Sequence, residues 1–394
     1  MLYFSIFKIQ TMIVFPRTVG SALNNQKNGE DRVVTNSNFQ AVFDGHRGNA
    51  ISEYAANHFH SILLQQLSFK SIKTTQSPTT HSSPNTNNNL NNTTTVDSLE
   101  IAKDALRETF LQLHENARRL KQLSGTTAVV FWCCQVASSS SEWFGLCANA
   151  GDSRAVLSIS STAKRLTVDH TATCEFEKNR IENVGGKVEF GRVADAEGDG
   201  VLCVSRGIGN FDLEPSFIPD PHLSEPINLN DNTNEFIILA SDGLWDVFTD
   251  QEVVDLVKKD LLSGNTPRTC AAHLTQISAE RGSKDDTTVV VIVLCEHLFN
   301  CCKENLKIQN EKQNRFASPE KPEKMMTCSN GIGSGSKSHT AGNSVMQQHP
   351  PRRVHRPPKK ARHGSIRIRY KDGGDDDDGE KRKVQEDDDG FDFL

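Results

Sequence analysis

The amino-acid sequence predicts an α+β fold in which β-sheets are covered by helices. Apolar residues recur at helical spacing in two long segments near the N-terminus and in two shorter segments further along the chain. Elsewhere the apolar residues form short β-branched or aromatic runs bounded by Gly, Asp and Ser, which is typical of strands. Because the helices come in pairs and the strands in clusters, we expect a layered α+β domain without internal repeats.

The first two predicted helices are long and amphipathic. The apolar positions that predict them are Ile51, Tyr54, Ala55, Phe59, Ile62, Leu63 and Leu67, and then Leu99, Ala102, Leu106, Phe110, Leu113, Ala117 and Leu120. Between them "TTQSPTTHSSPNTNNNLNNTTT" has no periodicity and predicts a surface loop. Two more helices are expected at "CEFEKNRIENVGG", closed by Gly185 and Gly186, and at "DQEVVDLVKKDLL", followed by Ser263 and Gly264.

Four strands are predicted where the apolar period changes. They are "TTAVVFWCCQVA", "WFGLCANAG", "EFIILASDG" and "TTVVVIVLC". Together with the helices they place one large domain at residues 20–298, with a polar insertion at about 70–97. Residues 1–19 form an apolar segment of unclear role. Residues 299–394 are poor in large apolar side chains, so we expect a disordered, low-complexity tail with a basic block and then an acidic one.

Composition narrows the class of protein. The net charge of −6 does not suit a general nucleic-acid binder. The opening "MLYFSIFKIQTMIVF" is interrupted by Lys8 and Gln10 and is too short to span a bilayer, so no membrane association is expected. Ten cysteines form neither a disulfide framework nor zinc-ligand spacing, which favours a reduced compartment.

Acidic residues follow or precede several predicted strands. They are Glu30, Asp31, Asp44, Asp152, Asp242, Asp246 and Asp285. A single Asp-Gly pair is most often a turn, which is the competing interpretation at each position. If the strands are neighbours, however, the carboxylates gather in one cleft and repel one another by about 4 kcal/mol per pair at 4 Å. A cation must then neutralise them, and oxygen ligands suit Mg²⁺ or Mn²⁺.

Nine short motifs, in order along residues 20–298, resemble those of the PP2C family of metal-dependent serine/threonine phosphatases. They are "GEDR", "AVFDGHRG", "SGTTAVV", "NAGDSRAVL", "LTVDH", "RIENVGGKV", "VSRGIGNF", "LASDGLWDV" and "GSKDDTTVVVIV". The resemblance implies a four-layer α/β/β/α sandwich, in which two antiparallel sheets are flanked by antiparallel helix pairs. It also implies a binuclear metal centre that activates water to dephosphorylate phosphoserine and phosphothreonine.

The same resemblance implies a role for each site residue. Asp44 matches the carboxylate that bridges both metals, and the carbonyl of Gly45 is the neighbouring ligand. The other matches are Asp242 and Asp285 for the first metal, Glu30 for the second, Asp31 supporting that shell, and Asp152 and Asp246 with Asp242 for a weaker third metal. His46 matches the general acid that protonates the leaving oxygen. We therefore expect phosphoprotein substrates, two Mg²⁺ or Mn²⁺ ions and a monomer.

Two positions depart from the family pattern. Gln26 stands where an arginine usually binds the substrate phosphate, and the adjacent Lys27 is a point charge without the arginine fork. Asn210 in "GIGN" replaces a usual aspartate. We expect both departures to affect substrate affinity more than catalysis. Arg154 and Arg206 are expected to anchor loops rather than to bind phosphate.

Two alternatives from other classes remain at this point. The first is a catalytically weak or inactive PP2C-like scaffold that binds phosphoproteins, which Gln26 favours and the retained carboxylates oppose. The second is a haloacid-dehalogenase-like phosphotransferase. That class needs an Asp-x-Asp pair, which is absent from "SDGLWD".

The basic cluster Lys359-Lys360-Ala361-Arg362, beside two prolines, predicts nuclear import and so residence in the nucleus as well as the cytoplasm. Replacing Lys359, Lys360 and Arg362 by alanine should move a fluorescently tagged chain out of the nucleus, because the import receptor reads these charges. An unchanged distribution in live-cell imaging would mean that the block is only a solvated part of the tail.

Overall fold

The computed structural model describes residues 17–76, 90–135 and 142–303, with side chains described outside 71–76 and 90–96. The described residues all belong to one compact unit. Most of the N-terminal apolar segment, through residue 16, lies outside the described residues. So does the basic cluster at 359–362.

Two antiparallel sheets form the centre of the domain. The five-stranded sheet has the order β1 (Thr18–Asn24), β17 (Thr287–Val293), β16 (Asn234–Ala240), β8 (Arg154–Ile159) and β9 (Thr162–Arg165). The six-stranded sheet contains β14 (His222–Leu223), β7 (Trp143–Ala150), β6 (Ala128–Gln135), β3 (Phe39–Phe43) and β2 (Arg32–Thr35), with β15 (Ile227–Asn228) also pairing with β7. The four strands predicted from the sequence are β6, β7, β16 and β17.

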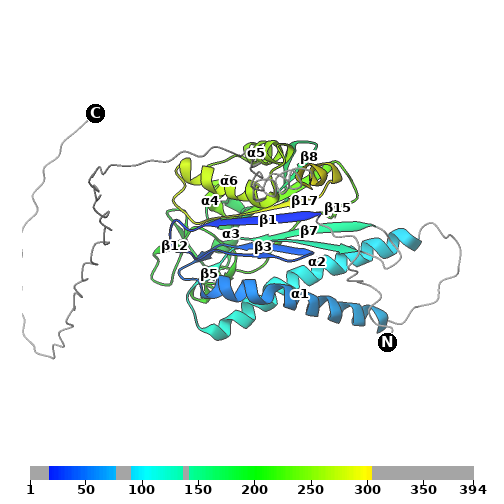
Figure 1. Cartoon of the computed structure of the whole chain (residues 1–394). Helices are drawn as coiled ribbons and strands as arrows, with labels where there is room; N and C mark the ends of the chain where they lie inside the picture. The colour runs from blue at the N-terminus through cyan, green and yellow to red at the C-terminus, as the bar shows by residue number, and fades with distance from the viewer. Residues whose placement is uncertain (1–16, 77–89, 136–141, 304–394) are drawn as a thin grey trace, which may run out of the picture. The chain divides into compact units, whose positions relative to one another are not determined.

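Helices cover the outer face of each sheet, as Figure 1 shows. Helices α1 (Ala50–Gln76) and α2 (Leu90–Ala117) lie against the six-stranded sheet. Helices α4 (Asp242–Trp245), α5 (Asp250–Leu262) and α6 (Pro267–Glu280) lie against the five-stranded sheet. The fold is therefore the predicted sandwich of two sheets flanked by helices.

Three apolar cores separate the layers. One joins α1 and α2 to the six-stranded sheet through residues such as Phe59 and Phe110, and another joins the helices after β16 to the five-stranded sheet. The third lies between the sheets and includes Val42, Phe131 and Ile292. β3 and β17 are buried along their whole length because they contribute to a core on each face. This explains why neither strand alternates between buried and exposed positions, and why its polar residues, Gln40 in β3 and Thr287 and Thr288 in β17, are buried as well.

Two smaller sheets lie outside the central pair. One has the order β13 (Ile208–Gly209), β5 (Gly125–Thr126) and β4 (Gly45–His46), so that Gly209, Gly125 and His46 stand in one row. The other contains β10 (Val188–Glu189), β11 (Arg192–Ala194) and β12 (Gly200–Leu202). Helix α3 (Glu175–Asn183) and the 3-10 turns η1 (Arg118–Leu120) and η2 (Phe211–Leu213) complete the described elements.

The structure differs from the sequence-based expectation in three segments. The insertion at about 70–97 is not wholly a loop, because α1 extends to Gln76 and α2 begins at Leu90. Helix α6 was not predicted, although Thr266 caps it and Pro267 opens it. Described secondary structure extends beyond 20–298 at both ends, since β1 begins at Thr18 and residues 296–303 are helical.

No helix among the described residues is long and apolar enough to cross a membrane.

Candidate active site

The first group of candidate residues stands at one end of the six-stranded sheet. Asp44 follows β3, and Glu30 and Asp31 precede β2, which pairs with β3. The backbone of Asp44 is fixed on both sides, because its carbonyl accepts from Thr127 N at 2.9 Å and its N–H donates to Thr127 Oγ1 at 3.3 Å. These contacts hold Asp44 at the end of its strand.

The second group belongs to the five-stranded sheet. Asp242 follows β16 and Asp285 precedes the antiparallel neighbour β17, so both lie at the same end of that sheet. Asp246 lies one helical turn after Asp242, on the same face of α4. Asp152 lies in the connection between β7 and β8, where the chain passes from one sheet to the other. The packing of the two sheets therefore brings both groups together.

The pKa values of these carboxyls show how closely they are gathered. Burial raises the pKa of Asp44 well above its usual value, and the charges of Asp31, Asp242, Asp152 and Asp285 raise it further. Burial likewise raises the pKa of Asp31 to about 6 and that of Asp242 to about 7.

Two carboxyls extend the cluster. Asp152 has its pKa raised well above the usual value by burial and then by Asp242, and burial followed by Asp285 raises the pKa of Asp246. A protein gains nothing in stability from such repulsion. The cluster therefore has the electrostatics of a cation site.

The residues fit divalent cations on chemical grounds. The Oδ1 atom of Asp242 is buried and has no hydrogen-bond partner, so one ligand atom is left unsatisfied by the protein. The donors are carboxylate oxygens, which Mg²⁺ and Mn²⁺ prefer. Within the described residues, no three His, Cys, Asp or Glu side chains are already drawn together around one point. The Asp44 carboxyl nevertheless lies within hydrogen-bond reach of both Asp31 and Asp242, so the carboxyls are already close together.

Gly45 and Glu30 approach each other closely. A Cβ atom on Gly45 would lie 2.5 Å from the carbonyl oxygen of Glu30, so only glycine fits there. The Glu30 carboxylate accepts from Gly48 N at 2.6 Å, and its carbonyl accepts from Ser52 Oγ at 2.6 Å. The backbone of Gly45 and the side chain of Glu30 are thus held beside Asp44.

Asp286 is a residue of the site that sequence reasoning missed. Its Oδ1 accepts from the N–H groups of Gln26 and Lys27, each at 2.8 Å, and its Oδ2 accepts from Gly29 N at 2.6 Å and Glu30 N at 3.1 Å. Burial alone would raise the pKa of Asp286, but these four donors outweigh burial and lower it. Asp286 therefore shapes the loop that carries Gln26, Lys27 and Glu30. The only signal in the sequence was the doubled aspartate in "SKDDTT".

Lys27 already supplies part of the missing positive charge. Its Nζ lies 2.9 Å from Asp285 Oδ2. This hydrogen bond is the main cause of its raised pKa, and the charges of Asp285, Asp242 and Asp44 add to it. Gln26, by contrast, is exposed and is held only through its backbone N–H. The loop thus presents one positively charged side chain, Lys27, to the carboxylates, and the side chain at position 26 carries no charge.

His46 is held by Asn210. The His46 Nε2 atom lies 2.6 Å from Asn210 Oδ1, and Asn210 Nδ2 donates to Leu123 O at 3.4 Å, which fixes the amide orientation. Nε2 therefore carries the proton and donates it to Asn210. A Cβ on Gly125 would lie 1.7 Å from Asn210 Oδ1, so glycine makes room for this contact. Burial lowers the pKa of His46 to about 4, and hydrogen bonding to Asn210 opposes the shift only in part.

This contact gives Asn210 a structural partner that the sequence did not indicate. The sequence assigned the departure at this position to substrate affinity, but the side chain contacts the candidate acid His46. An aspartate in the same place would favour the imidazolium by charge, whereas an amide carbonyl favours it only by a hydrogen bond. The residue at position 210 therefore bears on the protonation of His46, and its effect on substrate affinity stays a prediction.

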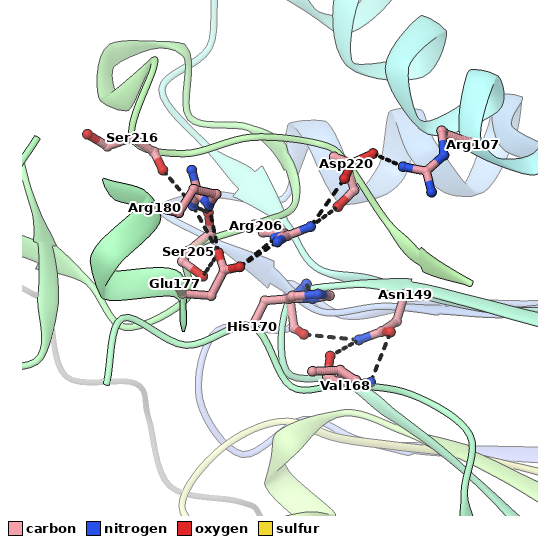
Figure 2. A network of polar contacts seen from close by, with 11 residues as sticks. Arg107, Asn149, Val168, His170, Glu177, Arg180, Ser205, Arg206, Ser216 and Asp220 are labelled. Atoms are coloured by element: carbon pink, nitrogen blue, oxygen red, sulfur yellow. Dashed lines mark hydrogen bonds and ion pairs between the residues drawn. The ribbon is translucent and has the colours of Figure 1, made fainter. Parts of the chain in front are cut away.

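Arg206 and Arg154 anchor loops, as predicted. Figure 2 shows Arg206 between Glu177 and Asp220. Its Nε donates to Glu177 Oε1 at 2.9 Å and its Nη1 to the Asp220 carbonyl at 3.0 Å. Arg154 donates to Asp169 and Asp250, each at 2.6 Å. With their donors engaged by these carboxylates, neither arginine is set to bind phosphate.

Comparisons with known proteins agree with this architecture. The family model for protein phosphatase 2C matches residues 16–287. "Probable protein phosphatase 2C 2" of Arabidopsis thaliana is 33% identical over 284 residues, which cover 68% of this chain and 64% of that protein. A "Protein kinase and PP2C-like domain-containing protein" of the same plant is also 33% identical, over 64% of this chain and 34% of that protein.

Solved structures show the same fold. The "Crystal structure of serine-threonine phosphatase 2C from Toxoplasma gondii" matches with a TM-score of 0.53 and 20% identity, covering 70% of this chain and 94% of that one. The "Structure of a C.elegans sex determining protein" matches with a TM-score of 0.56 and 23% identity, covering 72% and 67%. The chain spans less than two thirds of the length of the two plant relatives. Since the family model matches most of its length, the chain belongs to the protein phosphatase 2C family.

Proposed function

We propose that this chain is a metal-dependent protein phosphatase that hydrolyses phosphoserine and phosphothreonine in proteins, with Mg²⁺ or Mn²⁺ as cofactor. The observation that carries the proposal is the gathering of buried carboxyls from both sheets, with raised pKa values and one unsatisfied ligand atom. Carboxyl groups with strongly raised pKa values cluster at functional sites. Family membership supports the same reaction class.

Each residue group has a task in this proposal. Asp44 would serve both ions, with the Gly45 carbonyl beside it. Asp242 and Asp285 would hold the first ion, Glu30 would serve the second with Asp31 in support, and Asp152 and Asp246, together with Asp242, would hold a weaker third. Bound divalent ions would mask phosphate charge and supply an activated water as the nucleophile. Asp286 keeps the loop of Glu30 in place. No side-chain nucleophile is required.

His46 is the proposed general acid for the seryl or threonyl leaving oxygen, which is a poor leaving group without a proton. Its low pKa means that the ring is neutral in the free protein, with Nε2–H bonded to Asn210 and Nδ1 unprotonated. A dianionic phosphate monoester bound nearby favours the imidazolium, because an opposite charge raises the pKa of histidine. Substrate binding would thus favour the uptake of a proton from solvent at Nδ1, and the imidazolium would then donate a proton to the leaving oxygen.

A single assay separates enzyme from binder. The full chain should release phosphate from a phosphothreonine peptide in Mn²⁺, and excess EDTA should stop release. Binding of the peptide without turnover in Mn²⁺ would favour the inactive scaffold. Turnover that persists in EDTA, with a trapped aspartyl-phosphate, would favour the haloacid-dehalogenase-like mechanism.

Gln26→Arg should strengthen substrate binding. The loop backbone at position 26 is already fixed by Asp286, so a guanidinium there is presented beside Lys27. We expect the KM for a phosphopeptide to fall about tenfold, the effect of one hydrogen bond to a charged group. The kcat should change little, because the contact binds ground and transition states alike.

Gln26→Lys is the matched control for this prediction. It adds the same charge without the bidentate fork, so its KM should lie between those of the wild type and Gln26→Arg. A KM that stays unchanged in Gln26→Arg would show that another group already binds the phosphate.

A further inference from the structure

Helix α2 carries a buried histidine, His114, which is linked to the proposed acid His46 through Gly209 and Asn210. Its side chain is nearly inaccessible to solvent, at 5% exposure, and its ring packs edge-on against Phe211 with centroids 4.8 Å apart. Two hydrogen bonds fix it. His114 Nδ1 accepts from the N–H of Gly209 at 3.2 Å, and Nε2 donates to Glu214 Oε1 at 2.8 Å.

These two bonds require one form of the ring. Because the Gly209 N–H is a donor, Nδ1 must be unprotonated, and the proton of the neutral ring is on Nε2. Burial lowers the pKa of His114 and so favours this neutral form, while Glu214 opposes the shift and Arg118 reinforces it. Glu214 also receives Arg118 through Nη1 at 3.0 Å and Nη2 at 2.8 Å. The charged groups that act on the pKa of His114 are Glu214, Arg118 and Glu115.

Gly209 needs the partner that His114 supplies. It adopts a positive φ of 91°, and a Cβ there would lie 2.5 Å from the Ser124 carbonyl. Without this partner the buried N–H of Gly209 would be left unpaired, which is unfavourable for a backbone donor. The next residue, Asn210, is bound to the same carbonyl through its own N–H at 3.3 Å. Bonds to His114 and Ser124 thus fix two successive residues of this turn.

The turn formed by Gly209 and Asn210 contacts His46. Gly209 is in register with Gly125, and Gly125 is in register with His46, across the sheet β13-β5-β4. Asn210 reaches over Gly125 to His46 Nε2 at 2.6 Å. A shift of the Gly209 backbone would therefore move the Asn210 carbonyl relative to the imidazole.

We infer that His114 is a positioning residue for the reaction: as a neutral Nδ1 acceptor on Gly209 N–H, it holds Asn210 so that His46 is presented in one tautomer and orientation. This inference rests on the proposed role of His46 as general acid. His114 itself touches no substrate and acts through Gly209 and Asn210.

Two single substitutions separate the two bonds of His114. In His114→Asn the amide oxygen falls near the position of Nδ1, so the variant keeps an acceptor for Gly209 and loses the bond to Glu214. In His114→Gln the amide falls near Nε2, so the variant keeps Glu214 and loses Gly209. The two variants are matched in the number of lost hydrogen bonds, and thermal unfolding of the full chain checks that both remain folded.

The measurements are kcat on a phosphothreonine peptide, kcat on an aryl phosphate, and the ¹⁵N resonances of the His46 ring. We expect His114→Gln to lose about tenfold in kcat on the peptide, part of the 10²- to 10⁴-fold that a general acid contributes, and to keep its aryl-phosphate rate. Its His46 resonances should shift. His114→Asn should resemble the wild type in all three measurements.

The inference is overturned if the His46 resonances and the peptide kcat of His114→Gln stay at wild-type values. It is also overturned if His114→Asn loses as much as His114→Gln. The NMR result does not depend on turnover. Shifted resonances in His114→Gln, together with equal losses on both substrates in His46→Ala, would keep the positioning role and reject the general acid. Unshifted resonances with a selective loss in His46→Ala would do the reverse.

Discussion

Asp44→Asn should abolish phosphatase activity without unfolding the domain. The substitution keeps the shape of the side chain but removes the charge that, by resemblance, both ions share. Because bound ions supply several kcal/mol of charge stabilisation, we expect kcat on a phosphopeptide to fall on the order of 10³-fold or more. Calorimetric Mn²⁺ titration should show weakened binding, which is a readout independent of activity.

The same variant should be more stable than the wild type in metal-free buffer. The folded-state pKa of Asp44 is raised well above 3.8 by burial and by its acidic neighbours. The stability linked to such a group is present below pH 4 or so and is lost as pH rises towards the folded-state pKa, because the unfolded chain then releases its proton first. Asparagine has no such proton. The gain in unfolding free energy, about 1 kcal/mol at neutral pH, should shrink towards zero near pH 4.

Asp255→Asn provides the matched control, since Asp255 is an exposed carboxylate on α5. It should leave Mn²⁺ affinity, activity and stability in EDTA close to wild type. Asp242→Asn should behave like Asp44→Asn, because Asp242 carries the unsatisfied ligand atom. Wild-type Mn²⁺ affinity in Asp44→Asn would remove the metal assignment altogether.

Features that depend on local sequence could be predicted. The strands β16 and β17 each contain a continuous apolar run, Phe236–Ala240 and Val289–Val293, because both faces are covered, and this pattern is visible in the sequence. Helix α5 has the predicted bounds because Thr249 and Glu252 form a capping box at its start. The apolar core positions of α1 and α2 also follow from their periodicity.

Helix α6 and the ends of α1 and α2 could not be predicted from an apolar stripe. The buried face of α6 includes the small or polar residues Cys270, Ala271 and Thr275, which weaken the period. In the insertion the helices continue through polar sequence, since lengthening an existing helix needs no new nucleation. The remaining signal for α6 was its N-terminal cap, Thr266 followed by Pro267.

The second layer of the site depends on tertiary contacts. Asp286 binds the loop at 26–30 from more than 250 positions away in the sequence, and Asn210 meets His46 across 164. Motif spacing placed the carboxylates, but it gave no register between β13, β5 and β4. This is why the contacts of Asn210 with His46 and of His114 with Gly209 could not be predicted from the sequence.

His46→Ala should lose activity selectively, according to the leaving group. A phosphothreonine alkoxide needs a proton as the bond to phosphorus breaks, whereas an activated aryl oxide hardly needs one. We therefore expect kcat on the peptide to fall 10²- to 10⁴-fold, and kcat on the aryl phosphate to fall far less. Mn²⁺ affinity should be retained, since the imidazole is bonded to Asn210 and the carboxylates are untouched.

The comparison of two substrates in one variant separates the acid from the cation site. A structural defect or a lost ion would lower both rates together, so only the ratio of the two rates reports proton donation. His58→Ala is the matched control, because His58 is exposed on α1 and bonds only its own helix at Tyr54 O. Its two rates should stay at wild-type values. Equal losses on both substrates in His46→Ala would mean that the low pKa of about 4 leaves the ring neutral throughout turnover, and the leaving oxygen would then take its proton from water.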